Sequence, residues 1–162
     1  MNKERGLRCV VSGSFFKFKT EIDRTIDNLT DIGITVLAPD KGWLYKPPTR
    51  LYSLQDRQFR PLPTEQGMSL RQIEDGFLEA LSNSDFMYIV NPGGYLGSVV
   101  SLEIGFAMAL GIPIYSQEPV SPDLDSNPEW KATISQIKVR SVQEAAKEIE
   151  AVRYSCPKMF TQ

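Results

Sequence analysis

The feature that most constrains this chain is a regular alternation of short apolar runs with segments of helical periodicity. The most continuous run is 86–90, all hydrophobic, as expected for a central parallel strand covered on both faces. The similar run at 7–11 is followed by helical periodicity at 22–32, and the run at 34–38 is followed, after a long loop, by helical periodicity at 70–81. This alternation predicts an α/β protein, with a parallel sheet between two layers of helices.

The predicted elements continue in this order to the end of the chain. Strands are expected at 7–11, 34–38, 86–90, 112–115 and 134–139. Helices are expected at 22–32, 70–81, 98–110 and 142–152. Two Ser-x-x-Gln/Glu patterns, at 69–72 and 141–144, predict capping boxes. The order predicts a doubly wound five-stranded parallel sheet in a flavodoxin-like three-layer sandwich.

The length of 162 residues predicts one domain, 1–162, with a long loop insertion at about 41–66. The insertion is rich in proline, arginine and aromatic residues and has no helical or strand period. Its aromatic content favours an ordered role over disorder, and three interpretations stay open: a lid over the ligand site, a contact between subunits and a solvated loop. A second long loop is expected at 118–130.

Composition excludes several classes of function. The chain has no histidine and two cysteines, so Ser-His-Asp and Cys-His catalysis, a disulfide framework and a Cys-rich metal site are excluded, and no metal is predicted. A net charge of −2 disfavours binding to nucleic acid polymers. No apolar stretch fits a signal region or a membrane span, so we expect no membrane contact and a cytoplasmic location.

Ligands of open parallel sheets bind at the carboxyl ends of the strands. Here those ends carry polar and glycine-rich segments, which predicts one crevice lined by Gly13, Ser14, Phe15, Asp40, Gly94, Tyr95, Gly97 and Ser98. The helix that begins at Gly97-Ser98 offers free amide groups, which suit a phosphate or carboxylate. The alternative is a tight turn that needs glycine for its backbone geometry alone.

Glu103 is the most informative residue, because it lies on an otherwise apolar helix. We expect Leu102, Phe106 and Leu110 to form the core-facing stripe, with Glu103 beside it and semi-buried. A poorly hydrated carboxylate near a helix start is a candidate nucleophile. The alternative is a glutamate at the margin of the sheet that reaches solvent.

The sequence resembles the nucleoside 2-deoxyribosyltransferase and nucleotide N-glycosidase superfamily. The resemblance rests on Gly13-Ser14-Phe15, Tyr95-Leu96-Gly97-Ser98, Glu103-Ile104-Gly105-Phe106-Ala107 and Gly111-Ile112-Pro113-Ile114, and it covers residues 7 to 116. It implies an enzyme that cleaves or exchanges the N-glycosidic bond of a nucleoside or nucleotide. Gly97 stands where transferases of the family commonly carry an aspartate, which favours a hydrolase.

The same resemblance implies a role for each matching residue. Glu103 matches the nucleophile that attacks the anomeric carbon, and Asp85 or Asp75 is the candidate auxiliary acid. Gly13, Ser14 and Phe15 match the sugar and base pocket, and Gly97 and Ser98 match the site of a 5′-phosphate. The resemblance implies no cofactor and a homodimer or higher homo-oligomer.

Two other interpretations remain. The Pro92-Gly93-Gly94 loop also resembles that of the lysine-decarboxylase-like phosphoribohydrolases, which cleave the same kind of bond. The third interpretation is a non-catalytic domain that binds and senses a nucleotide.

Overall fold

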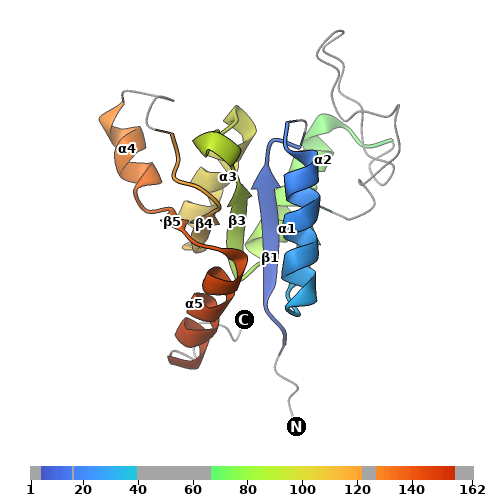
Figure 1. The fold of residues 1–162 in the computed structure, drawn as a ribbon. Helices are drawn as coiled ribbons and strands as arrows, with labels where there is room; N and C mark the ends of the chain where they lie inside the picture. The colour runs from blue at the N-terminus through green and yellow to red at the C-terminus, as the bar shows by residue number, and fades with distance from the viewer. Residues whose placement is uncertain (1–4, 16, 40–66, 122–126, 156–162) are drawn as a thin grey trace.

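The structure is a computed structural model that describes residues 5–15, 17–39, 67–121 and 127–155. The predicted insertion at 41–66 and Asp40 lie outside the described residues. Within this part of the chain, strands and helices alternate as the sequence predicts (Figure 1). The elements in chain order are β1 (Arg8–Gly13), α1 (Lys19–Asp31), β2 (Thr35–Ala38), α2 (Leu70–Ser82), β3 (Phe86–Val90), the 3₁₀ turn η3 (Pro92–Gly94), α3 (Ser98–Ala109), β4 (Ile114–Ser116), α4 (Pro128–Ile134), β5 (Lys138–Val139) and α5 (Val142–Ser155).

The five strands form one parallel sheet in the order β2-β1-β3-β4-β5. This order confirms the predicted flavodoxin-like topology, in which the chain winds outward from β1 in both directions. The carboxyl ends of the strands lie at the top of the sheet in Figure 1. The loops that follow β1 and β3 therefore meet at one edge.

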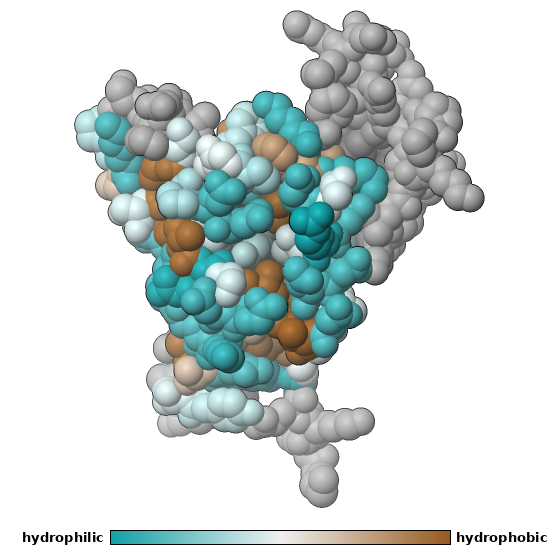
Figure 2. Space-filling model, viewed as in Figure 1, coloured by the Kyte–Doolittle hydropathy of each residue, from teal (hydrophilic) through white to brown (hydrophobic). Residues whose placement is uncertain are grey.

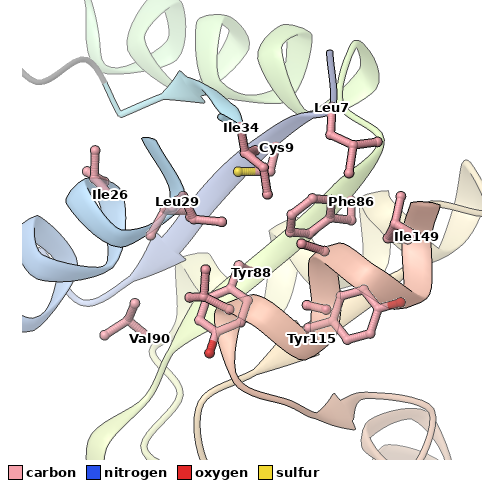
Figure 3. Packing of buried hydrophobic residues seen from close by; sticks show 14 of the residues in the cluster. Leu7, Cys9, Ile26, Leu29, Ile34, Phe86, Tyr88, Val90, Tyr115 and Ile149 are labelled. Atoms are coloured by element: carbon pink, nitrogen blue, oxygen red, sulfur yellow. The ribbon is translucent and has the colours of Figure 1, made fainter. Parts of the chain in front are cut away.

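Each face of the sheet has its own apolar core. Helices α1 and α5 cover one face, where Cys9, Phe86, Tyr88 and Tyr115 point from the strands (Figure 3). The ring edge of Phe86 meets Tyr115 with 5.9 Å between ring centroids. Helices α2, α3 and α4 cover the other face, where the alternate strand residues Val10, Met87, Ile89 and Ile114 point. All five residues of β3 are buried, which confirms the prediction of a central strand.

The predicted ends of the helices are confirmed where the sequence carried a cap. Ser69 and Gln72 form a complete capping box at the start of α2. Ser141 and Glu144 exchange the same kind of hydrogen bonds at the start of α5. Gly33 follows α1 with a φ of +84°, a conformation that favours glycine.

The region 118–139 differs from the prediction. The expected loop contains helix α4, and the strand predicted at 134–139 is limited to Lys138–Val139. The Asn127 side chain accepts hydrogen bonds from the Glu129 and Trp130 amides, and a proline occupies the first turn. Trp130 and Ile134, one helical turn apart, then pack against the core under α3. Tertiary packing of these two side chains favours a helix over the strand that the local alternation indicated.

A buried asparagine joins the loops after β3 and β4. The Asn91 amide donates to the Glu118 carbonyl at 2.8 Å and its oxygen accepts from the Glu118 amide at 3.0 Å. The Gly93 amide donates to the Glu118 carboxylate at 2.9 Å. Gly94 then passes directly beneath 119–121, and the Ser121 amide donates to its carbonyl. These contacts fix the backbone that leads into α3.

We expect Gly94→Ala to lower the free energy of unfolding by about 2 to 4 kcal/mol. A Cβ there would lie 2.6 Å from the Pro119 carbonyl oxygen and from the Ser121 nitrogen, at a φ of +75°. Gly93→Ala is the matched control, because Gly93 also has a positive φ but has open space around it. Its expected cost is about 1 kcal/mol. Denaturant titration measures both, and equal losses would contradict the close approach described here.

Candidate functional site

Glu103 is a buried carboxyl group at the carboxyl edge of the sheet. It lies in the second turn of α3 with 4% of its surface exposed. The Ser12 hydroxyl, fully buried near the end of β1, donates a short hydrogen bond to Glu103 Oε2. Because Ser12 and Val10 point to the same face, the contact lies between the sheet and α3. The interpretation of Glu103 as a glutamate that reaches solvent is therefore wrong.

The predicted core stripe of α3 is also wrong. Val100, Glu103, Ile104 and Ala107 face the sheet, whereas Leu102 is 57% exposed and Leu110 is 50% exposed. Phe106 is partly buried against the same core. The helix is apolar on all sides, so its sequence has no polar face that indicates which side points inward.

Burial controls the chemistry of Glu103. Loss of water raises the pKa of its carboxyl from 4.5 to about 8, against the opposing effect of the Ser12 hydrogen bond. The negative charge of Glu74 raises the pKa further. The carboxyl group therefore titrates near neutral pH, in the range where acid and base catalysts operate.

Glu74, on α2, is a second carboxyl group near Glu103. Helices α2 and α3 are in contact on the same face of the sheet. Burial and the neighbouring Asp75 raise the pKa of Glu74, while Arg71 lowers it. Its Oε1 atom is buried and has no hydrogen-bond partner within the described part of the chain. An unsatisfied buried carboxyl oxygen is costly for a fold and is a common mark of a functional site.

The two predicted auxiliary acids lie elsewhere. Asp85 precedes β3 at the opposite edge of the sheet, where it accepts the Arg8 amide at 2.7 Å and pairs with Arg5 at 3.1 Å. Asp75 is exposed and pairs with Arg71 at 2.7 Å. The structure brings neither carboxylate to Glu103.

The loop after β1 meets the loop after β3 at the predicted crevice. Lys17 Nζ lies 3.7 Å from the centroid of the Tyr95 ring, and Phe18 meets the same ring edge-on at 5.9 Å. Ser14 accepts the Lys17 and Phe18 amides with its carbonyl oxygen. Phe15 packs instead against the core under α1 and α5. The contacts place a lysine and an aromatic ring beside the start of α3.

Helix α3 begins at Ser98 with Gly97 as its N-cap, and no side chain caps it. Ser98 is exposed, so the first amide groups and a hydroxyl are available at the edge that carries Glu103. Gly13 and Gly94 are each required by a close approach of another backbone segment. A Cβ at Gly13 would lie 2.8 Å from the Val90 carbonyl oxygen, and Gly94 lies under 119–121.

Three side chains that lie at this edge are not predicted from the sequence: Ser12, Lys17 and Glu74. For Glu74 a signal existed, because it lies one turn before Phe77 and Leu78 and so interrupts the apolar stripe of α2 as Glu103 interrupts α3. Ser12 and Lys17 carry no such signal, because serine and lysine are ordinary residues at a strand end and in a loop.

A separate cavity of about 320 Å³ lies on the other face of the sheet, between α1 and the start of α5. Its lining includes Arg24, Tyr88 and Gln117. Tyr88 belongs to the α1–α5 core, and Glu103 to the opposite face. The cavity is therefore not the crevice predicted from the sequence.

The described residues contain no group of three or more histidine, cysteine, aspartate or glutamate side chains that could hold a metal ion. In the same part of the chain, no helix is both long enough and apolar enough to cross a membrane.

Comparison of structures finds proteins of the same fold. A CMP N-glycosidase of Clostridium botulinum, BcmB, is similar with a TM-score of 0.51 and 15% identity, over 90% of this chain and 98% of that chain. A conserved protein of Enterococcus faecalis V583 has a TM-score of 0.55 and 15% identity, over 91% of this chain and 99% of that chain. No family model matches the sequence, and a sequence comparison with curated proteins finds no match. The fold is therefore similar to that of a nucleotide N-glycosidase.

Glu103→Gln is expected to stabilise the protein at alkaline pH. The pKa of Glu103 is raised on folding, so the folded state loses stability as the pH rises from about 4.5 to about 8, by about 1.4 kcal/mol per unit. Glutamine keeps the shape and accepts from Ser12 without a charge. The free energy of unfolding of the variant should exceed that of the wild type by more than about 2 kcal/mol at pH 8 and match it near pH 4.5. A pH-independent difference would contradict the burial of an ionisable group here.

Proposed function

We propose that the protein cleaves the N-glycosidic bond of a nucleotide, with Glu103 as the nucleophile. The observation that carries the proposal is the poorly hydrated Glu103 carboxyl, held by Ser12 at the carboxyl edge of the sheet. The similarity in fold to a CMP N-glycosidase supports the same reaction class. The motif around Glu103, which resembles that of the superfamily, is a third and separate support.

The proposed reaction has two steps. A Glu103 oxygen attacks the anomeric carbon while the bond to the base breaks, which gives a glycosyl ester on Glu103. Water then attacks the same carbon and releases the sugar and Glu103. Because Glu103 is removed from water, its negative charge interacts strongly with the positive charge that develops on the sugar. Because Ser12 holds Glu103 Oε2, Oε1 is the proposed attacking oxygen.

The start of α3 is the proposed site of the 5′-phosphate. The uncapped amide groups after Gly97 and the Ser98 hydroxyl are suitable donors, and the positive end of the helix favours an anion. Lys17 supplies a full positive charge beside Tyr95. Tyr95 and the loop after β1 remain the proposed lining for the sugar and base, together with Asp40 from outside the described residues.

We expect the purified protein to release free base from at least one nucleoside monophosphate, with CMP tested first. Glu103→Gln should lower kcat by at least about 10³-fold, because the neutral amide cannot take the place of the carboxylate as nucleophile. Glu150→Gln, an exposed carboxylate on α5, is the matched control and should keep full activity. Chromatography measures the base, and mass spectrometry of the acid-quenched protein measures the glycosyl ester.

Three results separate the alternatives. Full turnover by Glu103→Gln excludes this nucleophile. A nucleotide that raises the melting temperature without release of base favours a sensing domain. Transfer of the sugar to an added second base, in preference to water, identifies a transferase.

We also propose that a second copy of the chain covers the outer face of α3. Val99, Leu102 and Leu110 are each half-exposed or more on a helix that carries no charged residue except the buried Glu103. A helix that is apolar on all sides is normally buried on all sides. The surface on the α1 and α5 side is predominantly hydrophilic, with only small separate hydrophobic areas (Figure 2).

Leu102→Asp should therefore shift the protein from dimer to monomer by at least about tenfold in Kd, because the charge would be buried in the interface. Ile32→Asp is the control, since Ile32 is also exposed but follows α1. Light scattering after size exclusion measures the mass of each. A monomeric wild-type protein would contradict the proposed dimer and leave the proposed reaction intact.

A further inference from the structure

Glu74, on α2, is a carboxyl group near Glu103 that lacks a hydrogen bond to one of its oxygens within the described residues. Glu74 Oε1 is buried without a partner in the described residues, while Arg71 pairs with Asp75 instead. No arginine or lysine of the described residues forms an ion pair with Glu74 or Glu103. A carboxyl group in this setting is favoured in its protonated form, which needs a hydrogen-bond acceptor.

We propose that Glu74 is the general acid and base of the reaction, the group that gives a proton to the leaving base and later takes one from water. The inference rests on the proposed function of Glu103. It assigns the role to a different residue from Asp75 and Asp85, which are held by Arg71 and Arg5. Among the described residues no basic side chain is paired with Glu74, and Glu74 is close enough for its charge to act on Glu103.

The protons balance over the cycle. In the proposed reactive form of the site Glu103 is ionised and Glu74 is protonated, so the pair holds one proton. As Glu103 bonds to the anomeric carbon, the electron pair of the broken carbon–nitrogen bond goes to the base, which takes the Glu74 proton. Water then attacks the anomeric carbon, the ester bond breaks, and the Glu74 carboxylate takes the proton of the water. Glu103 and Glu74 return to their starting states.

The surroundings of the pair define its pH dependence. On α2 the charged neighbours of Glu74 are Asp75 and Arg71. On α3 Glu103 is the only charged residue, and β1 contributes the neutral Ser12. Loss of Glu74 should therefore remove the alkaline limb of the activity profile, because that limb reports the acid that must be protonated.

The test compares Glu74→Gln with Asp75→Asn, two adjacent carboxylates on the same helix. On a nucleotide that the wild-type protein hydrolyses, Glu74→Gln should lower kcat by about 10² to 10⁴-fold and lose the alkaline limb. Asp75→Asn should stay within about twofold of the wild type, because the Asp75 side chain is exposed and held by Arg71. Glu74→Asp, which keeps a carboxyl group, should keep the limb.

A second readout separates proton donation from a structural effect. A base that is a better leaving group depends less on an acid. Two pairs test this: 5-fluorouridine monophosphate against uridine monophosphate, and 7-methylguanosine monophosphate against guanosine monophosphate, where the first of each pair has the better leaving group. Glu74→Gln should lose at least about tenfold less activity on the better leaving group of the pair. Glu103→Gln should lose activity equally on both.

The outcomes are distinguishable. An equal loss by Glu74→Gln on both nucleotides of a pair, or an unchanged alkaline limb, overturns the role of Glu74 while hydrolysis by Glu103 stands. The same holds if Asp75→Asn is as slow as Glu74→Gln. If the wild-type protein releases no base from any nucleotide, the proposed function fails and the role of Glu74 fails with it. Where Glu74→Gln does not fold by circular dichroism, Glu74→Ala with added azide takes its place, and the glycosyl azide is the expected product.

Discussion

The hydrogen bond from Ser12 to Glu103 joins the centre of the sheet to α3, and the organisation of this edge depends on it. A carboxyl group removed from water costs stability unless it is neutral or well solvated by the protein. Here one hydroxyl from β1 solvates one oxygen of Glu103, and a second carboxyl group, Glu74, lies near it. An apolar residue at 103 would pack against Ile104 and the sheet at lower cost. The unfavourable choice supports the proposed role of Glu103.

The topology explains why two glutamates from distant parts of the chain meet. In a parallel sheet each helix begins near the carboxyl end of the strand before it and runs back along the sheet. The first turns of α2 and α3 therefore lie at the same edge, and both helices cover the same face. A glutamate in the second turn of each helix, at 74 and 103, then lies at this edge, where the charge of Glu74 acts on Glu103. Asp85, at the start of β3, is carried to the opposite edge by the same rule.

The sequence predicts well what local patterns determine. The runs that became β1, β2 and β3, the capping boxes of α2 and α5, and the strand order all follow from period and spacing. Helix α4 was missed because its evidence is only Asn127-Pro128 and the pair Trp130 and Ile134, whose burial depends on α3. The inward face of α3 was missed because an apolar helix has no preferred side until its neighbours are placed. Glu103 itself was found because a single charge in an apolar run is visible without a structure.

The unusual composition of α3 reflects two demands on one helix. Its inner side holds a carboxyl group that needs a dry environment, and its outer side carries Val99 and Leu102 with no charge to attract water. Charged residues on the outer side would place further fixed charges close to Glu103 in a region of low dielectric, where they would shift its titration. An apolar outer side leaves the titration of Glu103 to Ser12 and Glu74. Covering that side with a second copy would protect the exposed leucines and exclude water from the back of the site, so association and reactivity would favour the same apolar sequence.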